Sequence, residues 1–335
     1  MVPISRFNEL LADIEPSPTT KSNASTGHQG IRQHLQIHES YEKRFVRAFL
    51  SGSYARDTAI RPTATEEGRE RPDVDIIVVT NHTQADQPDA VLRELCRALE
   101  SGESPYTVER INKRSVRVVT WAAEMDVVPV IIAGGAFMIA DRETGQWKLT
   151  NPPAHTTWSS AQNTAFDERF KPLIKLFKWW RRINPSGKRP KGFVLEMLVA
   201  QHGPKDQKHW GEAFAQLLEN IYAAHGPTAG LGVKPFIGDP GVPGNDILAK
   251  VTVAQWKDFI EKVRVYAEIA RRAQSTNDME EATRLWRRVF GERFKSTSNL
   301  ARATTASGFA VAPVAPANYT FPNQPAAPTR PRDFA

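Results

Sequence analysis

The pattern of apolar and polar positions divides the chain into two parts. In the first part, short apolar runs alternate with polar loops, and one helical segment (89–100) lies among them. Runs of four to eight apolar residues bounded by turn residues are typical of buried strands. We expect Gly134-Gly135 to end this main sheet pattern. Strands are predicted at 45–50, 73–79, 115–120 and 125–132, with 115–120 and 125–132 forming a hairpin, and a small additional hairpin is predicted at 137–140 and 146–149.

The second part begins after Asn151-Pro152-Pro153, where nearly every segment has apolar residues three and four positions apart. That spacing is typical of amphipathic helices, so helices dominate the second half. Two further helical segments precede the first strand, and the second of them is mostly polar, which favours a solvated helix face. The helices are predicted at 4–14, 20–38, 165–183, 193–201, 210–225, 253–274 and 278–289.

These elements predict an α+β protein in three parts. Residues 1–150 would hold the N-terminal helices and a mixed sheet, and residues 151–295 a helical lobe. Residues 296–335 are rich in Ser, Thr, Ala and Pro and have no periodicity, which predicts a disordered C-terminal tail.

Composition narrows the function classes only slightly. The chain has 335 residues, 40% of them hydrophobic, and a net charge of +7, which favours an anionic ligand without choosing among nucleotide, nucleic acid and membrane surface. The single cysteine, Cys96, excludes an intrachain disulfide and a cysteine metal cluster, and we expect it in the core. No run of eighteen apolar residues and no secretory signal pattern is found, so a soluble cytoplasmic protein without membrane contact is expected.

Candidate chemistry gathers around the first two strands. The first apolar run stops at Gly52-Ser53, and Asp73-Val74-Asp75 opens the next run. Because side chains alternate along a strand, Asp73 and Asp75 share one face. Asp126 supplies a third carboxylate within an apolar run, where an unpaired charge is costly.

Three carboxylates of this kind could bind two Mg²⁺ ions, or Mn²⁺ in their place, because these cations prefer hard oxygen ligands. Nucleotidyl transfer uses such ions to activate a hydroxyl and to neutralise the pyrophosphate leaving group. The backbone at Gly52 and the hydroxyl of Ser53 would contact phosphate. Two structural alternatives stay open: Asp73 and Asp75 as solvated strand caps, and Asp126 in a salt bridge to a neighbouring Lys or Arg.

The second part offers cations on one predicted helix. Lys171 and Lys175 are one helical turn apart, so they share a face and could both reach nucleotide phosphates. A solvated basic face is the alternative interpretation for this row. Trp179 and Trp180, on the same helix, are expected to pack in the core.

Together these motifs resemble the CD-NTases, bacterial nucleotidyltransferases of the polymerase beta superfamily that are related to cyclic GMP-AMP synthase and oligoadenylate synthetase. The resemblance covers about residues 20–295. It rests on two groups of segments. In the first part these are 52–58, Asp73-Val74-Asp75-Ile76 and Asp126, and in the second part 173–180, 191–196, Asp239-Pro240 with Asn245, and 285–291.

The resemblance implies a polymerase-beta-like nucleotidyltransferase lobe and a helical lobe that bind nucleoside triphosphates, ATP among them. It implies Asp73, Asp75 and Asp126 as metal-binding catalytic residues, Lys175 as a triphosphate contact and Phe193 near a base. Relatives often have serine where this chain has Gly192.

The implied product is a cyclic di- or trinucleotide second messenger that serves CBASS antiphage defence. Regulatory or conjugating partner proteins of a CBASS operon are implied as well, the conjugating ones acting at the C-terminal tail. Two alternatives remain. One is a linear oligo(A), poly(A) or tRNA-modifying nucleotidyltransferase, and the other is a catalytically inactive scaffold that binds nucleic acid.

Overall fold

A computed structural model describes residues 2–63, 68, 71–100, 106–185, 187 and 189–296. The predicted tail from 297 onward and residues 64–67, 69 and 70 lie outside these residues. The chain folds into two compact units. Among the described residues, the helical unit comprises 2–17, 53–63 and 150–296, and the sheet unit comprises 18–52, 68, 71–100 and 106–149.

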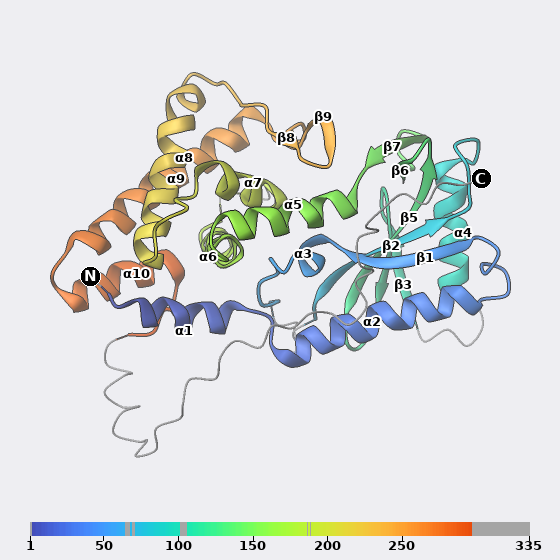
Figure 1. Cartoon of the computed structure of the whole chain (residues 1–335), viewed down its shortest axis with the longest axis horizontal. Helices are drawn as coiled ribbons and strands as arrows, with labels where there is room; N and C mark the ends of the chain where they lie inside the picture. The colour runs from blue at the N-terminus through green and yellow to red at the C-terminus, as the bar shows by residue number, and fades with distance from the viewer. Residues whose placement is uncertain are drawn as a thin grey trace, which may run out of the picture. The chain divides into compact units, whose positions relative to one another are not determined.

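The sheet unit is built on a mixed sheet of seven strands within the described residues (Figure 1). The order is β1-β2-β5-β4-β3, with β6 paired to β5 and β7 paired to β6. β2 and β5 are parallel, and the neighbours β1 and β4 are antiparallel to them. The strands are β1 (Phe45–Ser51), β2 (Asp73–Thr80), β3 (Thr107–Ile111), β4 (Val116–Val119), β5 (Glu124–Ala133), β6 (Ala136–Asp141) and β7 (Gln146–Thr150).

The predicted strands are confirmed, but two expectations about the sheet are wrong. Gly134-Gly135 does not end the sheet, because both glycines have positive φ and form the turn that joins β5 to β6. The predicted additional hairpin, β6 and β7, therefore continues the main sheet through β5. β3 was not expected from the sequence.

The helices α2 (Pro18–Ile37) and α4 (Pro88–Glu100) pack on the sheet. α2 approaches closely at Gly27, where an added Cβ would lie 2.9 Å from Sδ of Met125 on β5. The solvated face expected for α2 is wrong at His28, which is buried. Burial and the neighbouring charge of Arg32 lower the pKa of His28 to about 4, so this ring is neutral at pH 7.

The helical unit contains α1 (Ile4–Ile14), all but the first residue of the four-residue α3 (Gly52–Ala55), and the helices after residue 150. Its core is rich in aromatic side chains, including Phe177, Trp180 and Trp286. The expected burial of Trp179 and Trp180 is confirmed, as is that of Cys96 in the sheet unit. The later elements are α5 (Pro152–Ala165), α6 (Phe170–Ile183), α7 (Gly192–His202), α8 (Trp210–Gly230), β8 (Gly238–Asp239), β9 (Val242–Asp246), α9 (Val253–Ser275) and α10 (Met279–Phe290).

The helix predicted over 165–183 begins too early. Asp167 and Glu168 have positive φ, so the chain turns there, and α6 starts only at Phe170. The preceding helix, α5, was not expected because its sequence is mostly small and polar. Asn151 caps it by accepting a hydrogen bond from the backbone N–H of Ala154.

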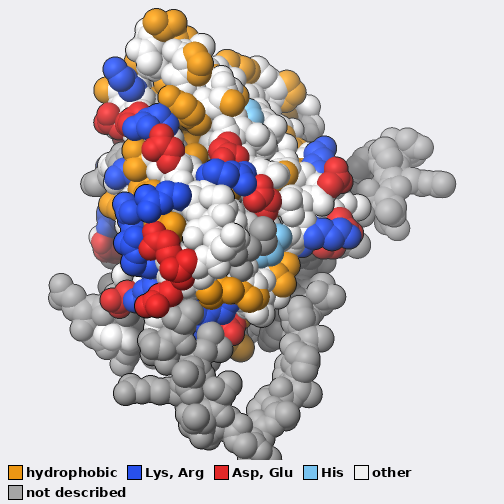
Figure 2. Space-filling view, turned by 90° about the vertical axis from the view of Figure 1, so that its left-hand side faces the viewer, with side chains coloured by type: hydrophobic (Ala, Val, Ile, Leu, Met, Phe, Trp, Pro, Cys, Tyr) orange, Lys and Arg blue, Asp and Glu red, His pale blue; other side chains and the backbone are white. Residues whose placement is uncertain are grey.

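The surface of the helical unit carries charges of both signs. Figure 2 shows Lys and Arg side chains interspersed with Asp and Glu on the side where α9 and α10 lie in Figure 1. On these helices, Arg264 pairs with Glu261 and Arg284 with Glu281. In the part of the chain that the structure describes, no helix is long and apolar enough to cross a membrane.

Candidate active site

The parallel pair β2 and β5 brings the candidate carboxylates together. Asp75 lies directly opposite Asp126 in the register, and Asp73 lies opposite Glu124. Asp73 and Asp75 are two residues apart on β2, and Asp126 is the partner of Asp75 on β5. All three side chains therefore lie on one face of the sheet. The side chain of Asp73 is 70% exposed, and that of Asp126 is 20% exposed. The shared face predicted for Asp73 and Asp75 is therefore present in the sheet unit, and the pairing of β2 with β5 adds Asp126 to it.

The turn after β1 contacts one of these carboxylates. β1 ends at Ser51, which is paired with Asp75, and the next residue, Gly52, has φ +65°. A Cβ added at Gly52 would lie 1.8 Å from Oδ2 of Asp75. Glycine is required here both for the left-handed backbone and for the close approach of the carboxylate.

Ser53 is grouped with the helical unit. It lies in the four-residue α3, and its backbone oxygen accepts a hydrogen bond from the N–H of Thr58. Thr58 is fully buried. The segment after the Gly-Ser pair is thus folded back by a local backbone contact.

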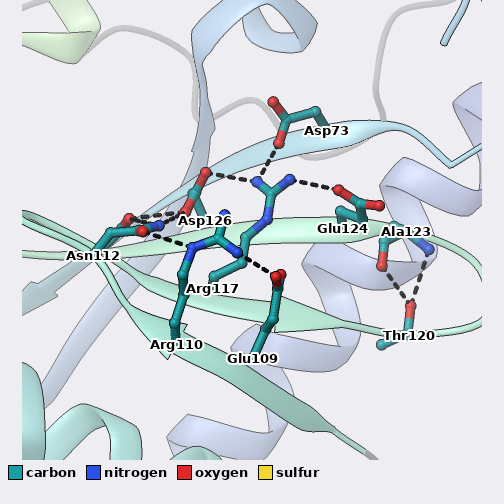
Figure 3. A network of polar contacts seen from close by, with 10 residues as sticks. Asp73, Glu109, Arg110, Asn112, Arg117, Thr120, Ala123, Glu124 and Asp126 are labelled. Carbon is teal, nitrogen blue, oxygen red and sulfur yellow. Dashed lines mark hydrogen bonds and ion pairs between the residues drawn. The ribbon is translucent and has the colours of Figure 1, made fainter. Parts of the chain in front are cut away.

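Asp126 is held by neutral donors from the turn between β3 and β4 (Figure 3). The hydroxyl of Ser115 donates to its Oδ1 at 2.8 Å, and the side-chain amide of Asn112 donates to the same oxygen at 3.0 Å. The side chain of Asn112 in turn accepts a hydrogen bond from Nε of Arg110 at 3.0 Å. These bonds fix the orientation of the Asp126 carboxylate and leave Oδ2 for another partner.

That partner is Arg117 of β4, which the sequence did not single out. Its Nη1 lies 2.7 Å from Oδ2 of Asp126 and 2.5 Å from Oδ1 of Asp73, and its Nη2 lies 2.5 Å from Oε2 of Glu124. Burial alone would lower the pKa of Arg117, but the charges of Asp73 and Asp126 raise it above its ordinary value. The salt bridge weighed for Asp126 is therefore present, and it includes Asp73 as well.

The donor chemistry of this face suits a divalent cation. Carboxylate oxygens on adjacent strands are the hard ligands that Mg²⁺ and Mn²⁺ prefer. With Arg117 between Asp73 and Asp126, however, no three acidic, His or Cys side chains of the described residues converge as a metal site. The guanidinium of Arg117 contacts two of the three carboxylates, those of Asp73 and Asp126.

The lysines predicted to contact phosphate differ in environment. Lys175 is buried, and its Nζ lies 2.9 Å from Oε1 of Glu15 and 3.3 Å from Oδ1 of Asp57. The alternative of a solvated basic face is therefore wrong at Lys175. Lys171 is partly exposed near the start of α6, and its backbone N–H donates to the side chain of Asn163.

Phe193, expected near a base, lies in the first turn of α7 and is partly exposed. The guanidinium of Arg56 lies 4.9 Å from the centre of its ring, and the ring of His155 lies 5.0 Å away. Asp239 lies 2.6 Å from Nε2 of His155 and accepts a hydrogen bond from Asn245. The sequence segment that contains Asp239 thus holds an aromatic group in place beside Phe193.

A buried ion cluster lies behind this aromatic group. Glu196 is fully buried and contacts Arg56 at 2.9 Å, Lys178 at 2.7 Å and the hydroxyl of Thr58 at 2.9 Å. Burial alone would raise the pKa of Glu196, but the charges of Lys178 and Arg56 lower it to about 2. The only sequence signal for it was an acidic residue within an apolar helical segment.

Taken with the mixed sheet and the helical unit, a Gly-Ser turn beside three aspartates on adjacent strands defines the class of the protein: it is a nucleotidyltransferase. A family model described as Second Messenger Oligonucleotide or Dinucleotide Synthetase domain matches residues 1–163. The chain is 44% identical to a cyclic AMP-AMP-AMP synthase of Acinetobacter sp., over 98% of this chain and 97% of the relative. The chain belongs to the CD-NTase family and is a cyclic oligonucleotide synthase.

Solved structures agree with this fold. The Bradyrhizobium diazoefficiens CD-NTase CdnG in complex with GTP matches with a TM-score of 0.73 at 17% identity, over 91% of this chain and 98% of that one. The E. coli MS115-1 CdnC:HORMA-deltaN complex matches with a TM-score of 0.68 at 18% identity, over 87% and 98% of the two chains. At these identities the likeness shows the fold alone.

Proposed function

We propose that this enzyme joins three molecules of ATP into cyclic AMP-AMP-AMP with release of pyrophosphate. The observation that carries the proposal is the 44% identity, over nearly the full length of both chains, to the Acinetobacter cyclic AMP-AMP-AMP synthase. A cyclic dinucleotide or a product that contains guanosine would share the same chemistry, so the choice of base and ring size depends on this relative.

In the proposed reaction, Asp73, Asp75 and Asp126 are the catalytic carboxylates. Mg²⁺ ions bound to them would neutralise the triphosphate and lower the pKa of the attacking hydroxyl. The carboxylate of Asp75 lies where a Cβ at Gly52 would be, and that of Asp126 is held by hydrogen bonds from Ser115 and Asn112. Such fixed carboxylates support the reaction because little reorganisation is needed when charge develops.

The other proposed contacts are assigned by residue type and by resemblance. Gly52 offers close approach of the backbone to a phosphate, and Ser53 offers a hydroxyl. Lys175 and Lys171 would contact the triphosphate, with Lys175 exchanging a carboxylate partner for phosphate. Phe193 would pack against a base, a role that fits a partly exposed ring beside a guanidinium.

We further propose that the product is a second messenger of antiphage defence and that a partner protein regulates its synthesis. The similar fold of CdnC, solved in a CdnC:HORMA-deltaN complex, supports a regulatory partner of that kind. Conjugation at the C-terminal tail concerns residues outside the described part of the chain and stays a prediction. The face shown in Figure 2 carries charges of both signs, so this face is not a basic surface for nucleic acid.

The product identifies the reaction. Purified full-length protein is incubated with Mg²⁺ and with ATP alone, GTP alone, or all four nucleoside triphosphates, and the products are treated with phosphatase and analysed by mass spectrometry. We expect a phosphatase-resistant cyclic triadenylate from ATP alone. Linear oligoadenylates with free ends would instead identify the polymerising alternative, and no product from any mixture, with regulatory partners supplied, would refute the proposal.

A further inference from the structure

We propose that Arg117 is an internal counter-cation of the aspartate site, one that metal binding must displace from Asp73 and Asp126. The inference rests on the proposed function, because it takes these aspartates as metal ligands. It adds Arg117 to the site as a positioning residue. It also means that the metal affinity depends on a residue that is not itself a metal ligand.

The first support is the position of the guanidinium. Arg117 lies on β4 opposite Asp126 in the antiparallel register, and its side chain is only 11% exposed. One nitrogen, Nη1, contacts both Asp73 at 2.5 Å and Asp126 at 2.7 Å (Figure 3). A single donor shared by two proposed metal ligands occupies the position of a cation that bridges them.

The second support is the partition of contacts between the two oxygens of Asp126. Its Oδ1 receives both neutral donors, Ser115 and Asn112, whereas its Oδ2 contacts only Arg117 among the hydrogen bonds described for it. Displacing Arg117 would therefore free one oxygen while the other keeps the carboxylate oriented. Asp73 is largely exposed, so it can turn toward a metal once the guanidinium withdraws.

The third support is that Arg117 keeps a carboxylate when it leaves the two aspartates. Its Nη2 contacts Glu124, and in Figure 3 Glu124 and Asp126 lie on opposite sides of the guanidinium. A salt bridge to this acid can hold the withdrawn side chain near the site. Without metal, the positive charge of Arg117 offsets the repulsion among the clustered carboxylates. A bound divalent ion would offset the same repulsion in its place.

Counting of free Mn²⁺ by electron paramagnetic resonance, without nucleotide, tests this exchange in the full-length protein. We expect Arg117→Gln to bind Mn²⁺ about tenfold more tightly than wild type, the size expected for a unit charge about 5 Å from a divalent ion in a water-like dielectric. In EDTA the variant should melt at a lower temperature than wild type, and Mn²⁺ should raise its melting temperature by more. Unchanged or weaker Mn²⁺ affinity would overturn the inference.

Arg93→Gln is the matched control, because it removes the same charge from an exposed position on α4 of the sheet unit, where Arg93 pairs with Asp89. Its Mn²⁺ affinity should equal that of wild type. If Arg117→Gln does not fold, nuclear magnetic resonance of arginine-labelled wild type decides, with the Nε–H signal of Arg117 assigned through Arg117→Lys. Mg²⁺ should shift this signal and leave that of Arg93 in place, and a static Arg117 signal at saturating Mg²⁺ would refute displacement.

The two proposals can fail separately. Cyclic product together with unchanged Mn²⁺ affinity in Arg117→Gln would refute the counter-cation alone. Tighter Mn²⁺ binding without any nucleotide product would support the counter-cation and leave the proposed reaction refuted.

Discussion

At the scale of single residues, the carboxylates of the site could be predicted and their partner could not. The two-residue period of a strand places Asp73 and Asp75 on one face from the sequence alone. Arg117 enters through the pairing of β4 with β5, and that register is not visible in a sequence without the fold. The sequence allowed a salt bridge between Asp126 and some Lys or Arg, but no local pattern indicated that Arg117 would be the partner.

Gly52 provides a prediction at this scale. Gly52→Ala should lower the rate of product formation by about a hundredfold or more, because the new Cβ would displace Asp75 and small misplacements of a catalytic group cost that much. Steady-state formation of cyclic product measures the effect. Thermal melting should show that the free energy of unfolding falls by about 1–2 kcal/mol, because alanine is strained in the left-handed backbone of this position.

The control for this variant is Gly134→Ala in the same unit. Gly134 also has positive φ, at +56°, but a Cβ there meets nothing within 4 Å. It should therefore share the loss of stability and keep the activity of wild type. Equal activity in both variants would show that Gly52 does not aim Asp75.

At the scale of elements, apolar periodicity predicted the strands and helices that bury large side chains. It failed for α5, whose sequence is small and polar, and for β3, in which most side chains are exposed. It also began the next helix too early, at residue 165 and not at Phe170, because Asp167 and Glu168 carry no sequence signal for the positive φ that separates the helices. Helix ends set by backbone turns of non-glycine residues are not readable from periodicity.

The buried ion cluster gives a prediction for α7. Glu196→Gln should destabilise the helical unit by about 3–5 kcal/mol, since it leaves Lys178 and Arg56 buried with too little negative charge. Urea unfolding followed by tryptophan fluorescence measures this loss. The Glu196→Gln variant should contain a larger fraction of unfolded protein at a given urea concentration, and the Mn²⁺ affinity of its sheet unit should be unchanged.

Glu261→Gln is the comparison, because Glu261 forms an exposed pair with Arg264 on α9. Exposed pairs contribute little to stability, so this variant should unfold at nearly the same urea concentration as wild type. If Glu196→Gln were equally mild, the cluster would have no structural role.

At the scale of the whole molecule, the sequence predicted the two kinds of structure but not every segment that each contains. The first helix and residues 53–63 are grouped with the helices after residue 150. This grouping results from contacts between residues far apart in the sequence. Examples are the hydrogen bonds that Arg56 and Thr58 donate to Glu196. Contacts between residues more than a hundred positions apart leave no periodic signal, so only the fold or a family resemblance can indicate them.

Release of pyrophosphate from ATP by the full-length protein, compared between wild type and two single variants, tests the central claim most directly. Asp75→Asn and Asp126→Asn should each lower the rate by at least about a thousandfold, because each removes a charged ligand of the reaction centre. Both should melt within a few degrees of wild type, and Asp89→Asn, at an exposed position on α4, should keep full activity. Turnover by either site variant at a rate near that of wild type would contradict the assignment of the aspartate face as the active site.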